Sequence, residues 1–111
     1  MSEPYQGKRR HKLLTKEMLS RIPGLYETED IDTGDKIVHV KFFSPYSNYT
    51  WFATEYDPIT KRFFGFVDGL AQEWGDFTYD ELVTAAIAGR TIPAVERDCS
   101  FKPCKFSELG F

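Results

Sequence analysis

Acidic side chains recur two residues apart at two places in the chain, which is the spacing that paired-carboxylate chemistry requires. Glu55 and Asp57 lie in a run typical of a β-strand, and Glu96 and Asp98 repeat the spacing near the C-terminus. Because alternate residues of a strand point to one face, each pair would share a face of a sheet. Two carboxylates in different surroundings can act as general acid and general base. His39, on the preceding predicted strand, would approach Glu55 if the strand register allows it.

Neither pair is accompanied by the other groups that such a catalytic site uses. No serine, cysteine or histidine stands at a spacing that would make it an activated nucleophile beside them. Carboxylates in pairs are also common on protein surfaces. We therefore predict that the protein is not an enzyme and assign no catalytic residue, with a small enzyme built on a Glu/Asp site as an alternative.

The cysteines and histidines do not follow a metal-binding pattern. Cys99 and Cys104 are the only cysteines, His11 lies in a basic N-terminal stretch, and His39 lies in a predicted strand. This set falls short of a zinc site. The acidic run 27–35 does not place its acids, glycine and final glutamate as an EF-hand loop does. We predict neither a bound metal nor a cofactor.

The two cysteines are predicted to be free thiols. In an extended chain their α-carbons would lie roughly 17 Å apart, whereas a disulfide needs them within about 7 Å. A tight loop around Pro103 would close this gap and keeps a bridge open as an alternative. Free thiols are typical of a reducing compartment.

Charge is distributed unevenly along the chain. The first twelve residues hold a basic cluster, whereas residues 13–111 hold 16 acidic side chains against 10 basic ones. The cluster consists of Lys8, Arg9, Arg10 and Lys12. Residues 1–12 lack apolar periodicity and are predicted to be a flexible basic tail, which would either solubilise the chain or contact phosphates.

Residues 13–111 are predicted to form a single domain. The chain has 111 residues, too few for two independent cores. A hydrophobic content of 41% and an aromatic content of 16% are globular values. No apolar run approaches the ~20 residues of a membrane helix, and no apolar signal region follows the basic residues, so a cytoplasmic protein is predicted.

The stretch 36–68 holds most of the strand-forming residues. Three strands are predicted at 36–43, 49–56 and 62–67, with turns at 44–48 and 57–61.

Simple alternation then assigns the side chains of these strands to faces. Val38, Val40 and Phe42 would share a buried face of the first strand. On the second strand Phe52 and Tyr56 would lie on one face, with Trp51 and Ala53 on the other; on the third, Phe63 would lie opposite Phe64 and Phe66, and Gly65 marks a bulge or close packing. A sheet that is apolar on both faces must be covered twice, by helices, by the terminal segments or by another molecule.

Two helices complete the prediction. The first covers 13–22, with Thr15 as N-cap and Pro23-Gly24 as its end, after which Leu25 and Tyr26 would pack against the core. The second begins at a capping box of Thr78 and Glu81, continues through Ala86 and Ile87, and ends at Gly89. Residues 70–77 are predicted to be a connection, 95–99 a short strand, and the C-terminal aromatic residues to pack. The fold class is α+β: an antiparallel β-meander of three to five strands packed with two helices.

Several segments in this order resemble the DUF2958 family of small proteins, often encoded on plasmids, integrative elements and phages. They are LLTKEMLSRIP, GLYETED, IVHVKFFSPYSNYTWFATEYD, FFGFVDGL, EWGDF and VERDCSFKP, and the resemblance covers about residues 13–109. It implies a single small α+β domain and a mobile-element setting, and it implies no activity. Cys99, Cys104 and the basic tail depart from the family pattern, so a role for them would not be a family role.

The function we predict is that of a non-enzymatic accessory or modulator protein of a mobile genetic element, acting through protein contacts. Its partner would be an unknown host or element-encoded protein, and a homodimer is an alternative. One version is a host-defence inhibitor whose carboxylates occupy a basic groove. The candidate partner-binding residues are Trp51, Glu55, Asp57, Trp74, Glu27, Glu29, Asp30 and Asp32.

Nucleic-acid binding is the second class of function. The tail residues Lys8, Arg9, Arg10 and Lys12 would contact phosphates. Tyr49, Trp51, Phe63 and Phe64 would form a stacking platform if the sheet were open. The acidic charge of residues 13–111 argues against this class.

Overall fold

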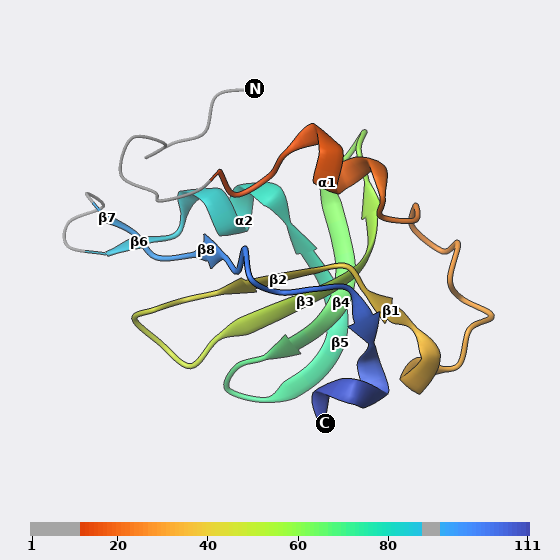
Figure 1. Cartoon of the computed structure of the whole chain (residues 1–111). Coiled ribbons are helices and arrows are strands. Elements are labelled where there is room, and N and C mark those ends of the chain that lie inside the picture. The colour runs from red at the N-terminus through yellow and green to blue at the C-terminus, as the bar shows by residue number, and fades with distance from the viewer. Residues whose placement is uncertain (1–11, 88–91) are drawn as a thin grey trace.

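The chain folds around one five-stranded antiparallel sheet (Figure 1). The computed structural model describes residues 12–87 and 92–111. The order across the sheet is β5-β4-β3-β2-β8. These strands are β2 (Val40–Phe43), β3 (Thr50–Asp57), β4 (Arg62–Asp68), β5 (Gln72–Thr78) and β8 (Glu96–Arg97). β2 to β5 form a meander, and the short β8 returns to pair with β2.

The remaining elements are short. Two further ladders pair β1 with β9 and β6 with β7. The elements outside the main sheet are α1 (Lys16–Ser20), η2 (Thr33–Asp35), β1 (Ile37–Val38), α2 (Tyr79–Thr84), β6 (Ala86–Ile87), β7 (Ile92–Pro93), β9 (Cys104–Lys105) and η3 (Phe106–Leu109). The predicted α+β class, with an antiparallel meander and two helices, is confirmed.

One face of the sheet packs under the two helices and the segment that precedes α1. Its core joins buried sheet residues to buried residues of α2 and to Leu13, Leu14 and Ile22. The sheet residues are Val40, Phe42, Ala53, Tyr56, Phe63 and Phe77. Figure 1 shows both helices on this side.

The other face packs under the C-terminal segment. Phe52 and Phe66 of the sheet join Val38 of β1 and Phe106 of η3 in a second core. Phe111 adds ring contacts to Phe52, Phe66 and Phe106, with centroid distances of 5.5, 4.9 and 6.0 Å. The chain therefore covers both faces with its own segments, and the two-sided aromatic pattern needs no partner to explain it.

A β-bulge in β3 changes the faces that simple alternation predicts. Ala53 pairs with Gly65, but Glu55 pairs with Phe64, so Thr54 is an extra residue between them. One extra residue reverses the facing of everything beyond it. Tyr56 consequently joins the core of Ala53 instead of that of Phe52, and the prediction that Phe52 and Tyr56 share a face is wrong.

Gly65 lies where β4 passes closest to β3. A Cβ at this position would lie 1.9 Å from the Phe52 carbonyl oxygen, and a backbone atom cannot rotate away as a side chain can. The prediction of a bulge or close packing at Gly65 is confirmed as close packing, opposite the bulge of β3.

The first predicted strand is divided into two. His39 separates β1 from β2, and its backbone N–H bonds to the Ala53 carbonyl at 2.9 Å. Val38, Val40 and Phe42 are all buried as predicted. However, Val38 belongs to the second core and the other two to the first, because β1 leaves the main sheet to pair with β9.

Both helices are shorter than predicted. Thr15 caps α1 by accepting from Met18 N at 3.1 Å, as expected, but Leu13 and Leu14 lie before the helix and are buried in the core. Thr78 likewise accepts from Glu81 N at 3.1 Å, which confirms that half of the capping box.

The end of α2 differs from the prediction. The helix stops at Thr84, since Ala86–Ile87 pairs as a strand with Ile92–Pro93. Gly89, predicted to end this helix, lies outside the described residues.

Residues 70–77 are not the connection that their composition suggested. Gln72–Thr78 forms β5, which pairs with β4 along its full length. Glu73 and Asp76 are exposed on this edge strand, and charges are a common feature of sheet edges. The predicted strand at 95–99 is shorter than expected, covering only Glu96–Arg97.

Replacing Gly65 by alanine should destabilise the protein, because the added Cβ meets the Phe52 carbonyl. Overpacking of this kind costs about 1–3 kcal/mol, and we expect a lower midpoint in urea unfolding. Gly75→Ala is the matched control. Gly75 is the cross-strand partner of Gly65, and a Cβ there would meet nothing within 4 Å. Equal effects of the two substitutions would contradict the close approach.

Candidate functional site

The carboxylate of Glu55 is the centre of a buried polar cluster. Its side chain is 3% exposed. One oxygen accepts from Tyr26 N at 2.9 Å, and the other accepts from Thr28 N at 3.1 Å and from the Thr28 hydroxyl. Hydrogen bonds to a charged acceptor are stronger than neutral ones. Glu55 therefore ties the segment after α1 to the centre of the sheet.

Lys36 completes this cluster from the other end of the acidic segment. Its side chain is buried, and its ammonium group donates to the Thr28 carbonyl and, at 3.2 Å, to the Thr28 hydroxyl. The Thr28 hydroxyl thus donates to a carboxylate and accepts from an ammonium. A buried charge must be compensated, and here the two opposite charges share Thr28 as their intermediary.

Tyr26 is held in an unusual backbone conformation beside this cluster. Its φ of 70° lies in the left-handed region, which non-glycine residues rarely adopt. The Glu55 carboxylate stabilises this conformation by accepting from its N–H. The ring is 71% exposed, so the prediction that Tyr26 packs against the core is wrong.

These residues line a cavity of about 270 Å³ between the acidic segment and the outer strands. Glu55 and Lys36 lie in its wall, and Tyr26 contributes an exposed ring. Phe64 of β4 contributes a second ring, stacked on Trp74 with centroids 5.8 Å apart. The other lining residues are Leu25, Glu29 and Asp76.

The acidic segment itself is presented to solvent. The predicted partner-binding residues Glu27, Glu29, Asp30 and Asp32 are all exposed. Glu27 accepts from Gly24 N at 2.9 Å. The other three make no side-chain hydrogen bond or ion pair within residues 12–87 and 92–111. Of the predicted exposed loop, Thr28 alone is buried, because it bonds to Glu55.

The other predicted partner-binding residues do not join this surface. Asp57 anchors the β3–β4 turn by accepting from Ile59 N at 3.0 Å and from the Thr60 hydroxyl at 2.8 Å. The Thr60 hydroxyl and then the Ile59 amide lower the pKa of Asp57. Trp51 packs against the first core and Trp74 against the second, so the sheet separates them.

Neither carboxylate pair has the environment of an acid–base pair. Both oxygens of Glu55 are occupied by the acidic segment and those of Asp57 by a turn. Asp98 lies 3.6 Å from Lys41 Nζ and accepts from Ser100 N at 2.9 Å. The paired-carboxylate spacing is explained here by local structure.

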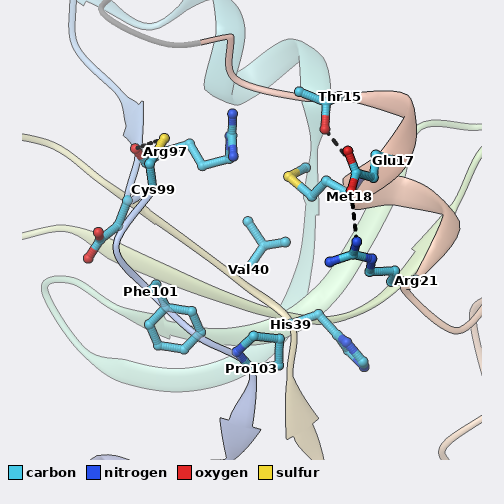
Figure 2. Close-up of a pocket in the computed structure, with 11 residues that line it drawn as sticks. Thr15, Glu17, Met18, Arg21, His39, Val40, Arg97, Cys99, Phe101 and Pro103 are labelled. Carbon is cyan, nitrogen blue, oxygen red and sulfur yellow. Dashed lines mark hydrogen bonds and ion pairs between the residues drawn. The ribbon is translucent and has the colours of Figure 1, made fainter.

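A second cavity, of about 280 Å³, brings together the histidine and one cysteine (Figure 2). Arg21 and Glu17 of α1 lie on one side and Arg97 and Cys99 of the C-terminal segment on the other, with Val40 between them. Figure 2 shows His39 and Cys99 at opposite ends of the cavity, so they do not form a catalytic dyad. Cys99 and Cys104 are both free thiols, and burial, followed by the charge of Glu108, raises the pKa of Cys104.

The sheet does not offer an aromatic stacking platform. Phe63 is fully buried in the first core, whereas Phe64 lies on the opposite face. Tyr49 and Trp51 stack at 5.6 Å, and the Tyr49 ring lies against Gly69. The tail residues Lys8, Arg9 and Arg10 lie outside the described residues; Lys12 is exposed, and its carbonyl accepts from Arg97 Nε at 3.0 Å.

The described part of the chain shows neither a cluster of metal ligands nor a membrane helix. Between residues 12 and 87 and from 92 onward, no three His, Cys, Asp or Glu side chains are grouped so that they could hold a metal ion. Within the same residues no helix has the length and apolar character needed to cross a membrane.

Sequence reasoning missed the residues that build the first cavity. It assigned Lys36 to the start of a strand, Thr28 to an exposed loop and Phe64 to one face of the sheet, without bringing them together. A signal was present, because Lys36 is the only base that directly follows five acids.

Fold and cluster together define the class of this protein: a small α+β domain whose antiparallel meander is closed on both faces and carries an anchored acidic segment. Comparison with protein families matches residues 13–107 to DUF2958, described as a protein of unknown function. The chain belongs to this family, and the resemblance seen in the sequence is confirmed. No curated protein and no solved structure matched in the other two comparisons.

Replacing Glu55 by glutamine should loosen the acidic segment, because the amide lacks the charge and one of the two acceptor oxygens. A hydrogen bond to a charged group contributes about 1.5–3 kcal/mol, and we expect a loss of unfolding free energy of this order. Hydrogen exchange at the Tyr26 and Thr28 amides should also accelerate. Glu73→Gln on the exposed edge of β5 is the matched control. Unchanged exchange at both amides would contradict the anchoring role.

The half-buried His39 should make stability depend on pH. Burial lowers its pKa, so below about 6.5 the unfolded chain binds protons before the folded one. Stability is then lost as pH falls from about 6.5 towards the folded-state pKa. We expect His39→Gln to lose less unfolding free energy than the wild type between pH 7.5 and 5.5 in urea titrations. A wild-type loss no larger than that of the variant would contradict this cause.

Proposed function

We propose that the protein is a non-enzymatic modulator that binds a protein partner through the acidic segment 27–35. The observation that carries this proposal is the contrast between the two sides of the segment. Inward, Thr28 is fixed to the buried Glu55 and Lys36. Outward, Glu29, Asp30 and Asp32 are exposed and form no ion pair within the described residues. A fixed row of unneutralised carboxylates is suited to a basic surface.

The physical basis of such binding is electrostatic complementarity. Like-signed carboxylates on a fixed segment steer a basic partner towards the protein and suppress wrong partners. Because the segment is already held by hydrogen bonds, little order has to be created on binding. A partner with a DNA-binding groove would meet carboxylates where phosphates normally lie. This is the host-defence-inhibitor version of the proposal.

The cellular setting is also part of the proposal. Family membership is consistent with a protein of a mobile genetic element working in the cytoplasm, and the partner would then be a host or element-encoded protein. Nucleic-acid binding through residues 1–12 stays a separate hypothesis. Removal of those residues would abolish binding to nucleic acid in that case and leave protein binding intact.

A pull-down with matched charge variants tests the proposal. The tagged protein is exposed to host lysate with and without nuclease, and bound proteins are identified by mass spectrometry. We expect one stoichiometric, nuclease-resistant partner, lost in the triple variant Glu29→Gln, Asp30→Asn, Asp32→Asn. Glu27 is left intact because it bonds to Gly24 N.

The control triple variant is Glu73→Gln, Asp80→Asn, Glu81→Gln, which removes the same charge from exposed positions elsewhere. It should retain the partner. Binding that both triple variants lose equally would reduce the effect to net charge. Binding that survives high salt unchanged would contradict an electrostatic interface.

A further inference from the structure

We propose that the cavity beside the acidic segment is a binding pocket for an arginine side chain of a protein partner. The proposal deepens the proposed function and rests on it only for the source of the arginine. The cavity has a volume of about 270 Å³. Ligand pockets commonly measure about 300–1,000 Å³, so this one suits a single side chain rather than a nucleotide.

The walls of the cavity provide two aromatic surfaces. Phe64 is half-buried and stacks on Trp74, which fixes its ring. Tyr26 is 71% exposed, and its left-handed backbone places an aromatic ring at a position where a core residue would not be. Aromatic faces attract cations, and the planar guanidinium of arginine stacks on them better than a lysine ammonium does.

The charge of the lining is negative at the surface and balanced at the base. Lys36 and Glu55 are both buried and share Thr28, so their charges offset each other at the base. Glu29 is exposed and unpaired among the described residues, and Asp76 is half-exposed with Arg62 Nη1 at 3.2 Å from one oxygen. The other Asp76 oxygen and the Glu29 carboxylate are left to receive a cation.

The pocket is prebuilt in the free protein. Strained backbone such as that of Tyr26 persists only where its surroundings over-determine it, and it is concentrated at functional sites. Here the surroundings are the Glu55 carboxylate and, through Thr28, the Lys36 ammonium. An arginine would therefore enter a pocket whose walls need no rearrangement.

A titration followed by ¹H–¹⁵N NMR tests the pocket without the partner. The probe is N-acetyl-arginine amide, whose only charge is the guanidinium, and the control probe is N-acetyl-citrulline amide, which has nearly the same shape without the charge. We expect the arginine probe to shift the Tyr26, Phe64 and Asp76 amides in a saturable manner. Equal shifts with citrulline, or no localised shifts, would overturn the proposal.

Two neighbouring residues provide the matched variants. Glu29 lines the cavity, whereas Asp30 is an equally exposed acid of the same segment outside its lining. Glu29→Gln should weaken binding of the arginine probe about two- to fivefold, as for one partly exposed ion pair. Asp30→Asn should change it less than twofold. Equal weakening by both variants would show attraction to the whole segment and overturn the pocket.

This titration fails independently of the proposed function. If the arginine probe does not bind while the triple variant still loses the protein partner, the acidic segment is the interface and the pocket is not. If the arginine probe binds as expected but no partner is recovered, the pocket stands and the proposed function falls. Phe64→Leu adds an aromatic test, because removing the ring should weaken the arginine probe while Glu29 and Asp76 remain.

Discussion

The bulge at Thr54 is the constraint on which the rest of the structure depends. It turns Tyr56 into the first core and turns Glu55 away from it, towards the acidic segment. Without the extra residue, the Glu55 carboxylate would point into an aromatic core, where an uncompensated charge costs several kcal/mol. The bulge lies opposite Gly65, and only a residue without a side chain fits against the Phe52 carbonyl there. One glycine and one extra residue thus position the cluster.

Closure of both sheet faces limits where a function can reside. The helices cover one face and the C-terminal segment the other, so the aromatic residues of the strands serve mainly as core. A stacking platform on the open sheet is excluded by the burial of Phe63. What remains accessible is the edge, the turns and the acidic segment, and among these the acidic segment combines a buried anchor with exposed charges.

Much of the fold was readable in the sequence, and the misses have physical reasons. Alternating apolar residues identified the strands, and Thr15 and Thr78 identified both helix starts. β5 was missed because its solvent-facing Glu73 and Asp76 make an edge strand resemble a polar loop. The cluster was missed because a bulge reverses facing without leaving a composition signal, so Glu55 was read as a surface acid.

The acidic segment has features that a purely connecting loop does not need. A left-handed tyrosine costs about 1–3 kcal/mol, whereas a glycine at that position would relieve the strain, since it adopts φ near 70° freely. Three neighbouring carboxylates without partners in the described chain add mutual repulsion. Glu55 and Lys36 offset these costs from beneath the segment. Folding therefore fixes an exposed aromatic ring beside unneutralised acids, and the ordering cost is met before any partner arrives.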